Sequence, residues 1–134
     1  MGPELIYVAG VLVLALVQIL AAAAARTQST GLEWNMGPRD TPVPDLSPLA
    51  ARLTRAQANL FETLPLFALA VIILHVTHRE NFSTALGAAL YFWGRVLYVP
   101  LYAAGVTFWR SLVWMTSLVG LVLVLAALFW ASGG

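Results

Sequence analysis

The sequence has no cysteine and no lysine, and only 10% of its 134 residues are charged. Without cysteine the chain has no disulfide, no thiolate nucleophile and no cysteine-based metal site, so any thiol chemistry must use a bound thiol. The net charge of +1 gives no dense basic patch, so we expect no nucleic acid among its partners. All seven cations are arginine, whose planar guanidinium pairs with carboxylates through two parallel hydrogen bonds.

Apolar residues make up most of the chain. Hydrophobic residues account for 60% of it, and the 7 basic and 6 acidic residues are too few to cover the surface of a soluble globule of this length. Soluble domains carry about 25% charged residues. The composition therefore excludes an ordinary soluble enzyme and a disordered protein, and the length predicts a single membrane domain over residues 1–134.

Four apolar stretches are each long enough to cross a bilayer, since about 20 helical residues span the roughly 30 Å hydrocarbon core. The first is expected to be a retained helix, because residues 1–4 lack the basic residues of a signal peptide. Ser47-Pro48 marks the start of the second, with serine as N-cap and proline at the first helical position. The predicted fold class is an all-α membrane protein, a four-helix transmembrane bundle. Its helices are expected at about residues 5–25, 48–76, 82–105 and 108–131.

Most arginines fall on one side of the predicted membrane. The long polar loop 26–47 and the ends of the neighbouring helices hold all but two of them, Arg79 lies on the opposite side, and Arg95 lies inside a span. By the positive-inside rule the loop is cytoplasmic and both termini lie outside the cytoplasm. We therefore expect a multi-pass integral membrane protein surrounded by membrane lipids, with the bacterial inner membrane as its location.

Two of the predicted helices carry polar stripes. Arg55, Asn59 and Glu62 are spaced i, i+4, i+7, which puts them on one helical face. An ionised group at membrane depth costs about 2.5–3.5 kcal/mol, so these side chains should face the bundle interior or a water-filled cavity. The stripe on the third helix has the same kind of spacing and consists of Tyr91, Arg95, Tyr98 and Tyr102.

Two interpretations of these stripes stay open. In the first they form a structural network in which Glu62 pairs with Arg95 or Arg55. In the second they line a polar pocket for a small anion, because one glutamate cannot neutralise several clustered arginines, with Arg26 and Arg110 joining from the ends of the first and fourth helices. His75 and His78 lack a third ligand nearby in the sequence, so no metal site is expected.

The segment Arg55-Ala-Gln-Ala-Asn59-Leu-Phe-Glu62-Thr-Leu-Pro65 resembles the R-A-x-x-N-x-x-E-x-x-P signature of the MAPEG family, the membrane-associated proteins in eicosanoid and glutathione metabolism. Gly94-Arg95 with Tyr98 and Tyr102, followed by Arg110-Ser111, resembles the third helix of that family and the start of its fourth. The resemblance covers about residues 48–131, plus a first helix that ends in Arg26. The sequence departs from the pattern at Ala58, where several members carry a second arginine.

The resemblance implies a homotrimer that binds glutathione between neighbouring protomers near the cytosolic face. Arg110 or Arg26 would stabilise the thiolate, and Tyr102 would assist them. The implied function is that of an integral membrane glutathione-dependent transferase or peroxidase acting on lipophilic electrophiles or lipid hydroperoxides. The alternative is a non-catalytic MAPEG-like protein that binds lipid or serves as an accessory subunit of a larger membrane complex. The glutathione-binding positions implied are Arg55, Asn59, Glu62, Arg95, Tyr98 and Tyr102.

Overall fold

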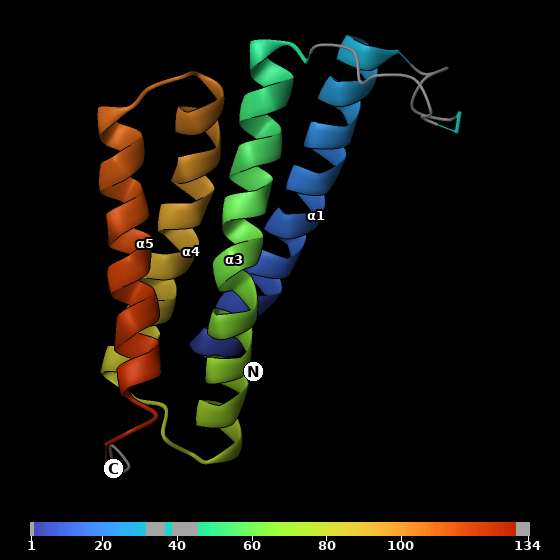
Figure 1. The fold of residues 1–134 in the computed structure, drawn as a ribbon. Coiled ribbons are helices and arrows are strands. Elements are labelled where there is room, and N and C mark those ends of the chain that lie inside the picture. The colour runs from blue at the N-terminus through green and yellow to red at the C-terminus, as the bar shows by residue number, and fades with distance from the viewer. Residues whose placement is uncertain (1, 32–36, 39–45, 131–134) are drawn as a thin grey trace.

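A computed structural model describes residues 2–31, 37–38 and 46–130, and its four helices stand side by side as a bundle (Figure 1). Figure 1 shows the chain running up and down in alternation from one helix to the next, as short connections require. The predicted all-α, four-helix architecture is therefore confirmed. The helices are α1 (Pro3–Thr30), α3 (Pro48–Val76), α4 (Phe82–Ala103) and α5 (Phe108–Ala126).

The bounds of α3 agree with the prediction, and those of the other helices differ at one or both ends. Ser47 caps α3, since its hydroxyl accepts a hydrogen bond from the amide of Ala50 at 3.1 Å. The first helix is longer than predicted and contains Arg26, because the polar residues after Ala25 continue the helix until Gly31, whose φ is 93°. The helices α4 and α5 end earlier than predicted, at Ala103 and Ala126. The predicted loop 26–47 therefore begins later, and most of it lies outside the described residues.

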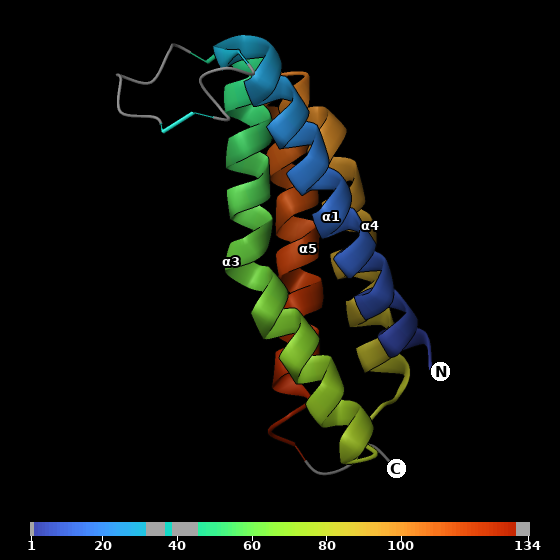
Figure 2. The same cartoon turned by 90° about the vertical axis from the view of Figure 1, so that its right-hand side faces the viewer.

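Two helices pass through proline. Pro65 lies within α3 and Pro100 within α4, where each removes a backbone donor from the helical ladder. Figure 2 shows that α3 changes direction partway along its length. Prolines are the usual cause of such a bend. The bend inclines the two halves of α3 differently (Figure 2).

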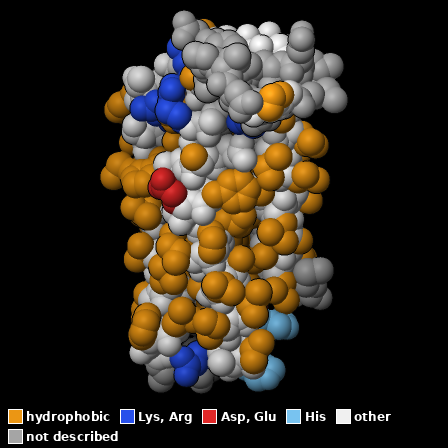
Figure 3. Space-filling model, turned by 45° about the vertical axis from the view of Figure 1, so that its right-hand side comes forward, with side chains coloured by type: hydrophobic (Ala, Val, Ile, Leu, Met, Phe, Trp, Pro, Cys, Tyr) orange, Lys and Arg blue, Asp and Glu red, His pale blue; other side chains and the backbone are white. Residues whose placement is uncertain are grey.

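Three of the helices that the structure describes, α1, α3 and α5, are long and apolar enough to cross a membrane. The helix α4 carries Arg95 and three tyrosines and is less apolar by the same measure. Large apolar side chains cover much of the outer surface (Figure 3). A lipid environment explains this exposure, since monomeric soluble proteins rarely expose contiguous apolar patches of such extent. The side that faces the cytoplasm remains a prediction from the arginine distribution.

The helices α4 and α5 make the most extensive contact in the bundle. A Cβ atom added at Gly87 would lie 2.7 Å from the backbone oxygen of Gly120, so only glycine fits there. Small residues allow membrane helices to approach closely in this way. The contact fixes the spacing between the two helices that carry Tyr98 and Arg110.

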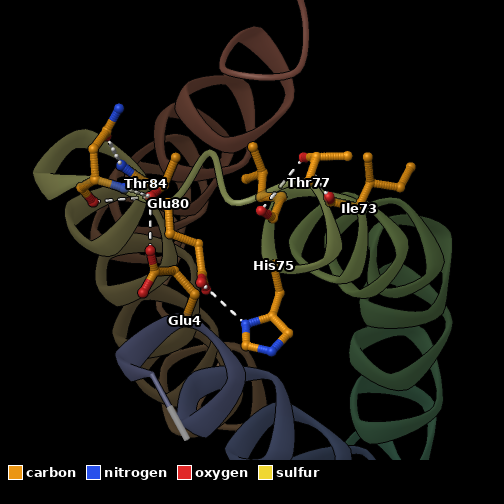
Figure 4. A network of polar contacts seen from close by, with 8 residues as sticks. Glu4, Ile73, His75, Thr77, Glu80 and Thr84 are labelled. Carbon is orange, nitrogen blue, oxygen red and sulfur yellow. Dashed lines mark hydrogen bonds and ion pairs between the residues drawn. The ribbon is translucent and has the colours of Figure 1, made fainter. Parts of the chain in front are cut away.

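A polar network joins the helix ends at the opposite end of the bundle from Arg55 (Figure 4). The hydroxyl of Thr84 in α4 donates to Glu4 of α1 at 2.7 Å, and Glu4 is only 2% exposed. Nearby, Nδ1 of His75 lies 3.0 Å from a carboxylate oxygen of Glu80. A buried carboxylate requires a hydrogen-bond partner, and Glu4 finds it in Thr84. This bond joins the start of α1 to the start of α4.

Replacing Thr84 with valine is expected to lower the free energy of unfolding by about 2 kcal/mol, because the buried carboxylate of Glu4 loses its donor. The matched variant Thr84→Ser keeps the hydroxyl and should stay close to wild type. Unfolding of the detergent-solubilised protein would measure both. Equal stability of the valine and serine variants would contradict the assigned role of the hydroxyl.

Candidate functional site

A cavity of about 250 Å³ opens between α3, α4 and α5 near the end of the bundle at which α3 begins. Four of its lining residues belong to, or lie beside, the predicted stripes. The cavity lies where the two stripes meet, since Asn59 of α3 and Tyr102 of α4 both line it. The lining residues are Asn59, Tyr98, Tyr102, Arg110, Ser111 and Trp114.

Arg95 is held behind this cavity. Its guanidinium NH1 donates to Oδ1 of Asn59 at 2.8 Å, and its central carbon lies 4.5 Å from the ring centre of Tyr98. The side chain is 1% exposed and does not line the cavity, so the structure places it as a support of the lining residues. The burial of Arg95 agrees with the expectation that a charged group in a membrane helix faces the interior of the bundle.

Tyr102 stands between two arginines. Nε of Arg55 donates to its hydroxyl at 3.0 Å, and the guanidinium of Arg110 lies 4.8 Å from the centre of its ring. The Arg55 guanidinium is 5.8 Å from the same centre. The tyrosine hydroxyl, which accepts from Arg55, keeps its own proton for another acceptor. Tyr102 thus aligns two cations and a hydroxyl donor at the cavity.

Glu62 does not pair with these arginines within the chain. Its side chain is exposed, and no hydrogen bond or ion pair within 4 Å joins it to another described residue. The pairings of Glu62 with Arg95 or Arg55 that a structural network requires are therefore not formed. Figure 3 shows basic side chains near the top of the molecule and again at its lower end, with an acidic side chain below the upper ones on a largely apolar face.

Arg26 lies apart from the other predicted site residues. Its NH1 donates to the hydroxyl of Thr54 at 3.2 Å, which links α1 to α3. It does not line the cavity, whereas Arg110 does. Within the chain the structure brings together Asn59, Tyr98, Tyr102 and Arg110. Arg55 and Arg95 bond directly to members of that group, whereas Arg26 and Glu62 lie outside it.

Two lining residues were not predicted as site residues. Trp114 donates from its Nε1 to Oδ1 of Asn59 at 3.2 Å. Ser111 donates its hydroxyl to the carbonyl of Thr107 at 3.0 Å and keeps an oxygen that can accept. The sequence held a signal for Trp114, because it follows Arg110 by four residues and so shares its helical face.

Tyr91, the first residue of the α4 stripe, lies in the core and not at the cavity. The hydroxyls of Tyr91 and Thr63 are 2.7 Å apart, and the Tyr91 ring stacks on Phe67 with 4.2 Å between the ring centres. Tyr91 is 1% exposed, so it joins α3 to α4 in the core. As for metals, the described part of the chain contains no group of three or more histidine or acidic side chains placed to hold an ion.

Comparison with known protein families identifies the family of the chain. The model of the MAPEG family matches residues 5–130, which is nearly the whole chain. No curated protein and no solved structure shows significant similarity to it. The matched region contains all the described residues of the cavity.

Proposed function

The chain belongs to the MAPEG family, a membrane family that includes glutathione-dependent enzymes as well as non-catalytic members, and from this premise we propose that it is an integral membrane glutathione transferase or peroxidase. The observation that carries the proposal is the set of arginines at the cavity that have no acidic partner. Arg55 and Arg110 flank Tyr102, and no carboxylate lies within 4 Å of either among the described residues. Such a site favours an anionic ligand.

Glutathione suits the site chemically. It carries two carboxylates, an ammonium group and a thiol, so arginines would bind the carboxylates and Glu62 would bind the ammonium group. A cation close to the sulfur favours the ionised thiolate, the form that attacks electrophiles. We assign this role to Arg110, which lines the cavity at the start of α5, rather than to Arg26, which is bonded to Thr54.

The reaction then consists of thiolate stabilisation and proximity. In the transferase reaction the sulfur forms a bond to an electrophilic carbon of a lipophilic substrate, and the group displaced or opened there takes the electron pair. In the peroxidase reaction the thiolate would attack an oxygen of a lipid hydroperoxide, and the oxygen–oxygen bond would break with its electron pair going to the lipid alkoxide, which takes up a proton. A second glutathione would then displace water from the resulting sulfenic acid to give glutathione disulfide. Both substrates would reach the cavity from the bilayer, and the hydroxyls of Tyr98 and Tyr102, which line it, would donate to a developing oxyanion.

The family resemblance implies a homotrimer, and the small cavity fits a site that a neighbouring protomer completes. The cavity volume of about 250 Å³ lies below the 300–1,000 Å³ of typical ligand pockets. Arg26 and Glu62 lie outside it, yet both belong to the positions that the family resemblance implies for glutathione. A neighbouring protomer that packs against the exposed face of α3 would enlarge the pocket and bring these groups to it. We therefore propose that the complete site forms between protomers.

The end of the bundle that carries the cavity is the arginine-rich end. The positive-inside rule predicts that this end faces the cytoplasm, which holds a glutathione pool. Both termini would then lie outside the cytoplasm, in a bacterial inner membrane. The proposed site and the proposed orientation thus agree with each other.

A non-catalytic role in binding lipid or in a larger membrane complex is the second candidate. The observation that favours it is Ala58, which is exposed and stands where several family members carry an additional arginine. A lipid phosphate would still find Arg55 and Arg110. The glutathione-dependent enzyme must bind glutathione, whereas the non-catalytic protein need not.

Glutathione is expected to raise the melting temperature of the detergent-solubilised protein, because a ligand that binds only the native state stabilises it by mass action. At 100 times the dissociation constant the stabilisation is about 2.7 kcal/mol. The tripeptide analogue with 2-aminobutyrate in place of cysteine is the control, since it keeps both carboxylates and should give a similar shift without supporting conjugation. No shift at millimolar glutathione would overturn the proposed activity and favour the second candidate.

A further inference from the structure

The carboxamide of Asn59 is held by side chains from two other helices. NH1 of Arg95, from α4, and Nε1 of Trp114, from α5, both donate to its Oδ1, at 2.8 and 3.2 Å. Asn59 itself belongs to α3, so three helices meet at one oxygen atom. This arrangement lies directly behind the cavity, which Asn59 and Trp114 line and Arg95 does not.

The two donors determine which way the amide points. A guanidinium N–H and an indole N–H can only donate, so the atom that faces both of them must be the oxygen. The flipped amide would set its NH2 group against two donors and lose both hydrogen bonds. Nδ2 is therefore directed away from Arg95 and Trp114. It bonds to no other described residue and is not among the fully buried polar atoms, so it is accessible from the cavity.

Arg95 cannot bind the ligand directly in this arrangement. It is 1% exposed, stacks on Tyr98 and reaches the cavity only through the oxygen of Asn59. Its Nε and NH2 atoms are buried without a hydrogen-bond partner. Burial of these unpaired donors is unfavourable, so the function of the guanidinium lies in the Asn59 amide that it orients.

We propose that Arg95 and Trp114 are positioning residues that fix Asn59 as a hydrogen-bond donor to the ligand. The proposal rests on the proposed function, because the ligand in question is glutathione. It assigns Asn59 to an acceptor group, a carboxylate or peptide carbonyl, and excludes the ammonium group from that position. It also gives Trp114 a specific atom, Nε1, through which it acts.

The hydrogen bond can be observed without any ligand by NMR of the ¹⁵N-labelled indole groups in detergent. The Nε1–H signal of Trp114, assigned by its loss in Trp114→Phe, is expected downfield of the signals of Trp93 and Trp109. Those two rings are more than half exposed and form no hydrogen bond with the described residues. In Asn59→Ala the Trp114 signal should move toward theirs. A signal that does not respond to Asn59→Ala would overturn the proposal, whether or not glutathione binds.

Affinity for glutathione provides the second readout. Trp114→Phe keeps an aromatic ring but removes the donor, and we expect glutathione to bind about tenfold more weakly, with kcat close to wild type. Trp114→His should restore part of the affinity, because imidazole carries a nitrogen at the same ring position as indole Nε1. Trp93→Phe is the matched control and should bind like wild type.

The double variant separates positioning from general damage to the fold. If Trp114 acts through Asn59, Trp114→Phe should have no further effect on affinity in the Asn59→Ala background. Additive losses in the double variant, or equal affinity of wild type and Trp114→Phe, would overturn the proposal. A wild-type protein that shows the downfield indole signal but no glutathione binding would contradict the proposed function and leave the fixed orientation of Asn59 supported.

Discussion

Replacement of Arg110 with alanine is expected to slow glutathione conjugation by about two orders of magnitude, the largest catalytic effect of any single substitution at the cavity. Arg110 lines the cavity from the first turn of α5, and its guanidinium lies 4.8 Å from the centre of the Tyr102 ring. Loss of one preorganised group that stabilises developing or existing negative charge typically reduces kcat by about 10²–10³. The initial rate with a chromogenic aryl halide at saturating glutathione would measure it.

The pH dependence identifies the cause. A cation beside the sulfur favours the thiolate, so removal of Arg110 should raise the pKa of the bound thiol. The pH at which the conjugation rate increases should therefore be higher in Arg110→Ala than in wild type. Arg110→Lys keeps the positive charge and should retain more of the rate. Arg52→Ala is the matched control, because Arg52 lies at the same end of the bundle and its NH1 bonds to the carbonyl of Ala103 at 3.5 Å, outside the cavity. A rate in Arg110→Ala equal to that of Arg52→Ala would show that the thiolate lies elsewhere.

Substitution of Gly120 with alanine is expected to lower the free energy of unfolding by about 3 kcal/mol, although it adds a single methyl group. A Cβ at this position would lie 2.6 Å from the backbone nitrogen of Tyr91 and also meet the backbone oxygen of Gly87. Backbone atoms of a helix cannot move aside as a flexible side chain does. The helices α4 and α5 would have to separate.

The separation should also affect the cavity. Asn59 receives one hydrogen bond from α4 and one from α5, so moving these helices apart weakens its support and lowers glutathione affinity. Unfolding of the solubilised protein and glutathione titration would measure both effects. Val119→Ile is the matched control, since it adds one methylene to a side chain that is 53% exposed on the same helix. If Gly120→Ala is as stable as Val119→Ile, the two helices pack less tightly at Gly120 than the short distances to Tyr91 and Gly87 indicate.

Several features were determined by the sequence alone. Apolar runs of bilayer length predicted the helices, and Ser47-Pro48 predicted the start of α3, because capping and proline preferences act within a few residues. The family signature followed from side chains at i, i+4 and i+7, and the family match confirms it. The lack of cysteine meant that the thiol of any thiol chemistry must come from a ligand.

The partners of each polar side chain were decided only by the tertiary structure. Helical spacing tells which residues share a face, but not which neighbour that face meets or how the two helices are rotated. Arg95 therefore bonds to Asn59 and not to Glu62, and Trp114 joins a site in which it was not expected. Arg26 bonds to Thr54, 28 residues away, and Glu4 to Thr84, 80 residues away. Contacts at such separations depend on how four helices pack together, which no local pattern encodes.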